Sequence, residues 1–263
     1  MKKSLMFALF VFFFAPIFAN AQSAFDGVWK FDINKAQLPK KPDVYLLQDG
    51  TYHCNTCVPP IVVKADGQDQ KVTGHPYFDT ISVKVVDDHT VELTQKKDGK
   101  VNGTSKSTVS SDDNTLRFEF SDSSASNSDP VTGKGESARV AKGPAGSHAI
   151  SGSWRTTKLA HLSDNALLVT FKLEGDSFSM SNPTGQSYTA KLDGTDAPFK
   201  GDPGTTSVSV KRLGKNSIEE TDKRDGKVIA VSRITVGADG KSMNITFTDK
   251  LHGTTSEFPA VKQ

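Results

Sequence analysis

The chain has 263 residues, of which 35% are hydrophobic, 24% are charged and 8% are aromatic. This composition excludes a disordered chain, a coiled coil, a collagen and a protein with several membrane spans. The formal net charge is +2, but Lys2 and Lys3 lie in a segment that we expect to be removed, which leaves equal numbers of basic and acidic residues. A neutral chain without a cluster of basic residues favours neither nucleic acid nor an anionic lipid surface as a partner.

Residues 1–21 have the features of a secretory signal peptide. After Lys2-Lys3 comes an apolar run of about 14 residues, Leu5 to Phe18, which is shorter than the roughly 20 residues of a membrane-spanning helix. Ala19-Asn20-Ala21 is a small-residue cleavage site. An uncleaved anchor is the alternative, whereas a lipoprotein anchor is excluded because no Cys follows the run. We expect cleavage near Ala21, a periplasmic or secreted mature chain, and no membrane insertion after signal removal.

An internal repeat covers most of the chain after residue 21. Residues 81–122 align without a gap with residues 208–249, and Gly27-Val28-Trp29 matches Gly152-Ser153-Trp154 upstream. Such self-similarity indicates a tandem duplication of one structural unit. The segment 142–148, KGPAGSH, is typical of a short linker. The sequence therefore predicts two domains, at residues 22–146 and 147–263, and we expect each of them to fold by itself.

Each unit is predicted to consist of strands joined by tight turns. Asp-Gly pairs, which suit two-residue hairpin loops, recur along both units. Between the turns apolar residues alternate with polar ones, as expected for strands with one buried face. The alternating residues are Ile81, Val83 and Val85, then Val91 and Leu93, then Leu116, Phe118 and Phe120, and in the second unit Val208, Val210, Met243, Ile245 and Phe247. The pattern predicts an all-β protein with two tandem antiparallel meander barrels of about eight strands each.

The two units resemble a family of secreted bacterial lipocalin-like proteins of unknown function. The resemblance rests on GVWK and GSWR at the start of the units, and on YTAKLDGTD, GDPGTTSVSVKR, DGKV and VGADGKSM. It covers nearly the whole chain after residue 21. It implies a barrel that opens with the Gly-x-Trp strand, and a basic residue on the last strand that packs over the tryptophan. Arg139 is the expected residue in the first unit, whereas the second unit ends in SEFPAVKQ, without an arginine.

One motif, His53-Cys54-Asn55-Thr56-Cys57, carries specific chemistry. Two cysteines outside the cytoplasm usually pair, and the turn-forming residues Asn55-Thr56 allow a short loop closed by a Cys54–Cys57 disulfide. A redox-active pair is one alternative, although the helix N-terminus that lowers a thiol pKa is missing from the pattern. A metal site with His53 and the distant His75 is another, with few ligands. We expect a structural disulfide with a modest stabilising effect.

Three further features have both a structural and a functional interpretation. Asp87-Asp88-His89 is interpreted as a solvated turn, with a metal or acid–base cluster as the alternative. Trp29 and Trp154 are expected to plug the closed ends of the barrels, with ligand stacking as the alternative. The Ser-rich segment 121–134 is an insertion in the first unit, expected to be a mobile loop or a lid. Because the units share no polar catalytic constellation, the sequence predicts no enzyme, no cofactor and no metal site.

The sequence leaves two main functions open. In the first, one or both barrels bind a small hydrophobic or amphipathic molecule in an apolar interior. The expected lining residues are Val83, Val85, Leu93, Leu116, Phe118, Phe120, Val210, Met243, Ile245 and Phe247. In the second, the barrels are solidly packed and the chain is a structural or interaction protein of the cell envelope, with a protein partner that the sequence does not identify.

Overall fold

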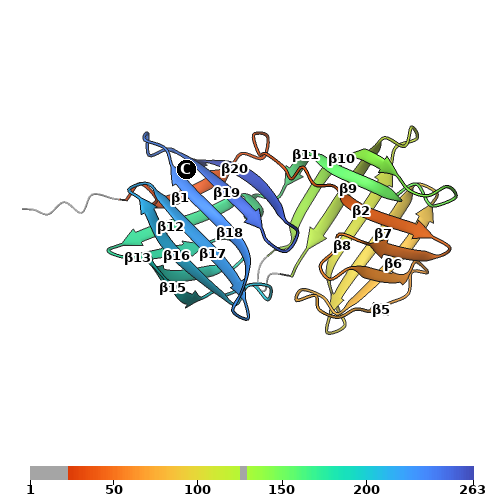
Figure 1. Cartoon of the computed structure of the whole chain (residues 1–263), viewed down its shortest axis with the longest axis horizontal. Helices are drawn as coiled ribbons and strands as arrows, with labels where there is room; N and C mark the ends of the chain where they lie inside the picture. The colour runs from red at the N-terminus through yellow and green to blue at the C-terminus, as the bar shows by residue number, and fades with distance from the viewer. Residues whose placement is uncertain (1–22, 125–128) are drawn as a thin grey trace, which may run out of the picture.

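The computed structural model describes residues 23–124 and 129–263. These residues form two ten-stranded antiparallel sheets, each rolled into a nearly closed, barrel-like shape (Figure 1). The all-β architecture and the two barrel-like sheets were predicted. Each sheet has ten strands, however, whereas the sequence predicted about eight. The predicted signal peptide lies outside the described residues. Within the Ser-rich segment 121–134, the ends of β9 (Thr115–Asp122) and β10 (Val131–Lys142) form sheet, and residues 125–128 lie outside the described residues.

The two sheets are named here the first barrel and the second barrel. In spatial order the first barrel contains β4 (Ile61–Lys64), β3 (Thr51–Cys54), β2 (Asp43–Gln48), β11 (Gly152–Leu162), β10, β9, β8 (Lys100–Val109), β7 (Thr90–Lys97), β6 (Thr80–Asp87) and β5 (Gln70–Lys71). The second barrel contains β14 (Ser187–Lys191), β13 (Ser177–Ser181), β12 (Leu168–Glu174), β1 (Gly27–Phe31), β20 (Thr254–Lys262), β19 (Ser242–Asp249), β18 (Lys227–Val236), β17 (Ser217–Arg224), β16 (Ser207–Gly214) and β15 (Asp193–Pro198).

Asp-Gly turns join several neighbouring strands, as the sequence predicts. At Asp49-Gly50, Asp98-Gly99 and Asp225-Gly226 both residues have positive φ. A two-residue type I′ turn requires this combination, because its twist matches that of the strands on either side. These turns fix the register of β2 on β3, β7 on β8 and β17 on β18.

The opening strands of the two repeats are exchanged between the barrels. β1, from the first repeat, lies between β12 and β20 of the second, with Trp29 opposite Lys262. β11, from the second repeat, lies between β10 and β2 of the first, with Trp154 opposite Arg139. Figure 1 shows the red β1 among the blue and green strands of one barrel, and the green β11 beside β10 in the other.

The sheets therefore do not follow the boundary between the two repeats. The first barrel contains strands from residues 43–142 and 152–162, and the second contains strands from residues 27–31 and 168–262. Two crossovers connect the barrels, at residues 32–42 and 163–167, and the second includes the one-turn helix α1 (Asp164–Leu167). Whether the segments 22–146 and 147–263 fold separately stays a prediction.

Each barrel has a buried core that contains the tryptophan of the other repeat. Trp154 is 1% exposed in the first barrel, and Trp29 is fully buried in the second. Each indole Nε1–H donates to a backbone carbonyl four residues earlier, at 2.8 Å, that of Ile150 for Trp154 and that of Phe25 for Trp29. The two rings thus have equivalent surroundings, and their complete burial supports the plug interpretation over ligand stacking. In the described chain no helix is long and apolar enough to cross a membrane.

Candidate functional site

The predicted lining residues fall into buried, half-buried and exposed groups. In the first barrel Val83 and Leu116 are buried, Leu93, Phe118 and Phe120 are half-buried, and Val85 is 40% exposed. In the second barrel Val210 and Met243 are buried, and Ile245 and Phe247 are half-buried. Val85 was expected in the core but does not lie there. It belongs to the last four residues of β6, all of which are exposed.

A row of residues across five strands is repeated in the two barrels. In the first barrel the row consists of Val83, Leu93, Ser105, Phe120 and Gly133, each opposite the next. In the second barrel the same places hold Val210, Glu220, Ser232, Phe247 and Ser256. Because Val83 and Val210 are fully buried, the row faces inward in both barrels. The rows differ most in chemistry where Glu220 replaces Leu93.

Glycines in β10 make room for two phenylalanine rings of β9. A Cβ atom added at Gly135 would lie 2.4 Å from the Phe118 ring, and one added at Gly133 would lie 2.5 Å from the Phe120 ring. Such distances are too short for real contacts, so each ring lies directly against a glycine backbone. The two rings are thereby held in place although both are half-buried.

A surface hollow of about 640 Å³ lies over β7 to β11. Part of its lining is a row of residues that stand opposite one another on successive strands: Glu92, Lys106, Glu119, Lys134 and His161. Beside it runs a row of hydroxyl residues: Thr94, Thr104, Ser121 and Thr132. On β11 the lining includes His161, which stands opposite Lys134. It does not include Leu162, which stands opposite the inward-facing Gly133. The hollow therefore lies on the outward face of the sheet.

Two of the predicted lining residues, Leu93 and Phe120, also border this hollow, but they belong to the inward-facing row, so their side chains point away from it. A neighbouring hollow of about 350 Å³ shares Lys106, Glu119 and Lys134 with it. The two hollows therefore form one continuous surface feature, in which charges of opposite sign alternate from strand to strand. Adjacent strands are about 4.8 Å apart, which sets the spacing of these charges.

Two carboxyl groups lie inside the second barrel, a feature that no sequence motif revealed. Glu220 is 9% exposed and accepts a hydrogen bond from the Tyr188 hydroxyl. Asp222, two residues further on β17, shares its face. Burial raises the pKa of both carboxyl groups, and the facing Glu220 raises that of Asp222 further. The strand alternation held the signal, since both carboxyls are in phase with the fully buried Ile218.

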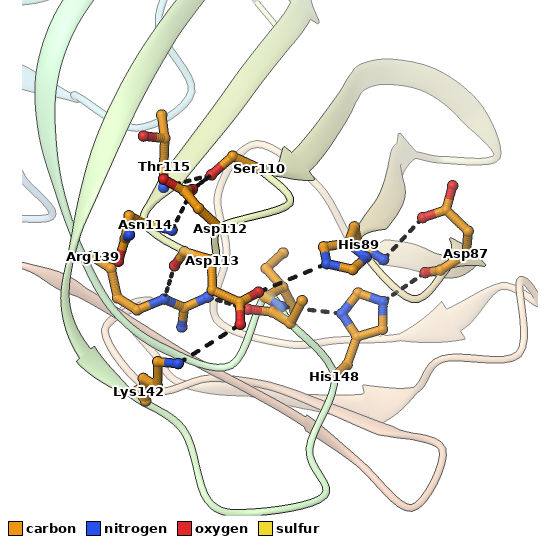
Figure 2. A network of polar contacts seen from close by, with 12 residues as sticks. Asp87, His89, Ser110, Asp112, Asp113, Asn114, Thr115, Arg139, Lys142 and His148 are labelled. Carbon is orange, nitrogen blue, oxygen red and sulfur yellow. Dashed lines mark hydrogen bonds and ion pairs between the residues drawn. The ribbon is translucent and has the colours of Figure 1, made fainter.

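The Asp87-Asp88-His89 segment belongs to a polar network at the edge of the first barrel (Figure 2). The backbone N–H of His89 donates to Asp87 Oδ1 at 2.9 Å, which holds the pKa of Asp87 below its usual range. His89 Nε2 lies 3.7 Å from Asp113 Oδ1, and His148 Nε2 lies 2.7 Å from the Asp87 carbonyl oxygen. These contacts fix the turns in place. Among the described residues no group of three or more His, Cys, Asp or Glu side chains is arranged to hold a metal ion.

Arg139 connects this network to the core. Its guanidinium donates to the carbonyl oxygens of Ser151 and Ala149, each at 2.7 Å, and to that of Asp113. The same guanidinium lies 4.0 Å from the centroid of the Trp154 ring. In the second barrel Lys262 Nζ lies 4.9 Å from the Trp29 ring centroid. A basic residue thus covers the tryptophan in each barrel, and because of the strand exchange it covers the tryptophan of the other repeat.

Cys54 and Cys57 form the predicted disulfide, with Cα atoms 5.4 Å apart. Cys54 lies at the end of β3 opposite Ile61, and the corresponding pair in the second barrel is Met180 and Tyr188. The disulfide is therefore a feature of the first barrel alone. Because it closes a loop of very few residues, we expect it to stabilise the fold by only about 1–3 kcal/mol.

Comparisons with protein-family models, curated proteins and solved structures found no match to this chain. The likeness to secreted lipocalin-like proteins therefore stays an interpretation of the sequence motifs.

Proposed function

We propose that the protein is a non-enzymatic binding protein outside the cytoplasm, and that the outward face of its first barrel holds a small amphipathic molecule. The observation that carries this proposal is the hollow of about 640 Å³ over β7 to β11. Its volume lies within the range of about 300–1,000 Å³ that is usual for small-molecule sites. The location is supported by the Cys54–Cys57 disulfide and by the signal-like sequence at residues 1–21.

The charged part of the lining suits a zwitterionic group. Lys106 and Lys134 supply positive charge, and Glu92 and Glu119 supply negative charge on the strands between and beside them. A ligand group with a single sign of charge meets a like charge one strand away, which costs free energy. A group that carries both signs a few ångströms apart meets an opposite charge at each end.

The apolar part of the ligand is expected to lie against the methylene stems of Lys106 and Lys134, over the strand backbone at Leu93 and Phe120. Leu93 and Phe120 border the hollow, and their side chains point into the barrel. The strand backbone beneath the ligand is already ordered by the sheet, so contact with it costs little conformational entropy when a ligand binds. The lining therefore combines apolar contacts with charges of both signs, which is the combination an amphipathic molecule needs.

The barrel interiors are the less favoured location. Core side chains, including Trp154 in the first barrel and Trp29 in the second, pack against one another on the inward faces. The proposed site therefore lies on the outward face of these strands and not in the interior, where the sequence predicted the lining residues.

A structural or interaction protein of the cell envelope is the second candidate. It is favoured by the neighbouring hollow of about 350 Å³, which extends the charged surface towards Arg117 and Glu136. These two residues form an ion pair, with Arg117 Nε 3.2 Å from Glu136 Oε1. A surface of this extent suits an extended protein partner better than a compact small molecule.

Calorimetric titration of the whole chain with a zwitterionic detergent, below its micelle concentration, tests the proposal. We expect saturable binding near unit stoichiometry. Exchanging both lysines, in K106E/K134E, is expected to abolish it, because the row then carries negative charge on four neighbouring strands. The matched control is R233E, since Arg233 occupies the place of Lys106 in the second barrel, and this variant is expected to bind normally.

The inward-facing variant F118D separates the two locations. Loss of binding in F118D with normal binding in K106E/K134E would place the ligand inside the barrel. If the unmodified chain binds no zwitterionic detergent at all, the small-molecule proposal fails and the interaction protein is favoured. Circular dichroism of each variant shows whether its fold is retained.

A further inference from the structure

The second barrel brings three acidic side chains together in its interior. Glu220 and Asp222 project from the same face of β17. The hydroxyl of Tyr188 on β14 donates a hydrogen bond to Glu220. Glu220 is 9% exposed and Tyr188 is 3% exposed. Oδ1 of Asp222 is shielded from solvent and has no hydrogen-bond partner among the described residues.

The other titratable groups that act on these carboxyls are also acids. Besides Tyr188, the negative charge of Asp202, from the segment before β16, acts on Asp222. No Lys, Arg or His is among the groups that shift the pKa of either carboxyl. If both carboxyls were ionised, two buried negative charges would face each other without a positive partner. Buried acid pairs avoid this state by keeping one proton between them.

The hydrogen bonds indicate which carboxyl is ionised. Glu220 accepts a hydrogen bond from the Tyr188 hydroxyl, and this bond favours its charged form against the cost of burial. Asp222 is the group that keeps the proton, because burial and the facing Glu220 raise its pKa to about 8. Once protonated, Asp222 has a hydroxyl to offer to Glu220 on the same face of β17, so that one negative charge would have two donors.

The first barrel provides a natural comparison. The residues at the corresponding places are Leu93, Gln95 and Ile61, as the register of the two sheets shows. None of the three titrates. The acid cluster is therefore specific to the second barrel and is not required by the fold, since the same strand arrangement forms without it.

We propose that Glu220, Asp222 and Tyr188 form a proton-operated switch, in which loss of one proton in mildly alkaline solution loosens the second barrel and leaves the first intact. The unfolded chain, whose Asp has a pKa of about 3.9, has already lost this proton at neutral pH. The folded chain therefore binds more protons than the unfolded chain between the two pKa values. Its free energy of unfolding is greatest at acid pH and falls as the pH rises through this window.

The two tryptophans allow each barrel to be followed separately. In W154F the remaining Trp29 reports on the second barrel, and in W29F the remaining Trp154 reports on the first. Urea unfolding followed by fluorescence between pH 5 and pH 9 is expected to show a falling midpoint for Trp29 and a nearly constant one for Trp154. Within the window the unfolding equilibrium constant is expected to rise by up to about tenfold per pH unit, as the loss of one proton requires.

Two replacements of the pair make the test decisive. E220L/D222Q installs the residues of the first barrel, and E220Q/D222N keeps the shape of both side chains without the charge. Either variant, provided that it folds, is expected to remove the fall of the midpoint between pH 5 and about pH 8. The proposal is overturned if the midpoint falls with pH to the same extent in these variants. It is also overturned if the midpoint falls in W29F, where Trp154 reports, and stays constant in W154F, where Trp29 reports. If both tryptophans report one cooperative transition, the comparison with the two variants still decides the matter.

Discussion

The guanidinium of Arg139 lies 4.0 Å from the ring centroid of Trp154, so the last strand of the first repeat holds the opening strand of the second. The contact crosses the boundary between the repeats. It exists because β1 and β11 have exchanged places, and it makes the first barrel dependent on a strand that the second repeat supplies.

Replacing Arg139 with Ala is expected to lower the free energy of unfolding by about 2–4 kcal/mol, because it leaves three backbone carbonyls without their donor and removes the cation–π contact. Urea unfolding measures the change. The control is Arg117→Ala on the neighbouring β9, where an exposed ion pair with Glu136 is expected to contribute less than about 1 kcal/mol. Equal losses in the two variants would contradict the role assigned to Arg139.

The strand exchange itself can be trapped by engineered cysteines. Val28 lies opposite Thr170 in the second barrel, and on its other side its carbonyl accepts the Gln263 N–H. The Val28–Thr170 pair is therefore of the non-hydrogen-bonded kind, with Cα atoms about 4.5 Å apart, which suits a disulfide. We expect V28C/T170C to cross-link rapidly on oxidation, as peptide mapping of the oxidised chain will show.

The control pair reports the arrangement without exchange. If β1 occupied the place of β11, Val28 would lie opposite Val44, the partner of Ser153 in the first barrel. Cross-linking of V28C/V44C in place of V28C/T170C would show that each opening strand stays with its own repeat.

The exchange also changes what is expected of the separated repeats. The segment 22–146 keeps β1 but lacks β11, and the segment 147–263 keeps β11 but lacks β1, so each lacks one strand of its sheet. Mixed together, the two segments are expected to form a 1:1 complex, because only the pair restores both exchanged sheets. Native mass spectrometry detects such a complex. Two stable monomers that do not associate would instead support the autonomous domains that the repeat predicts.

A single methyl group at Gly135 is expected to disturb the first barrel. The Cβ of Gly135→Ala would lie 2.4 Å from the Phe118 ring, and moving that ring is expected to cost about 1–3 kcal/mol. Gly214→Ala is the matched control, because a Cβ there meets nothing within 4 Å, and we expect little change. Thermal unfolding distinguishes the two, and comparable losses of stability would contradict the packing of Phe118 on Gly135.

Much of the architecture followed from residue patterns. Asp-Gly pairs indicated the hairpins, and at Asp49-Gly50 and Asp98-Gly99 both residues have the positive φ that such turns require. The alternation of Leu116 with its neighbours indicated a strand with one buried face, and Leu116 is buried. The turn-forming residues between Cys54 and Cys57 indicated the disulfide. Each of these features depends on residues that are close together in the chain, so it can be recognised from the sequence alone.

The strand exchange was not predictable from the same patterns. GVWK and GSWR share the glycine, the tryptophan and the basic residue, so the motif does not indicate which barrel each opening strand joins. The choice depends on whether residues 32–42 and 163–167 bend back as hairpins or cross to the other barrel, and this is a property of the whole chain. The acid pair, by contrast, was visible as charges in phase with Ile218, but its burial depended on which face of β17 the barrel encloses.

The pairing of β1 with β20 has a mechanical consequence. Because the strands run antiparallel with Trp29 opposite Lys262, a pull applied to the chain before β1 and after β20 opens their hydrogen bonds one after another, as a zipper opens. The first barrel lies along the chain between β1 and β12, so it bears no tension until β1 has been drawn out of the second barrel. Under load the second barrel is therefore the part that yields first, and the first barrel, with its disulfide and its charged outer face, keeps its shape while the second gives way.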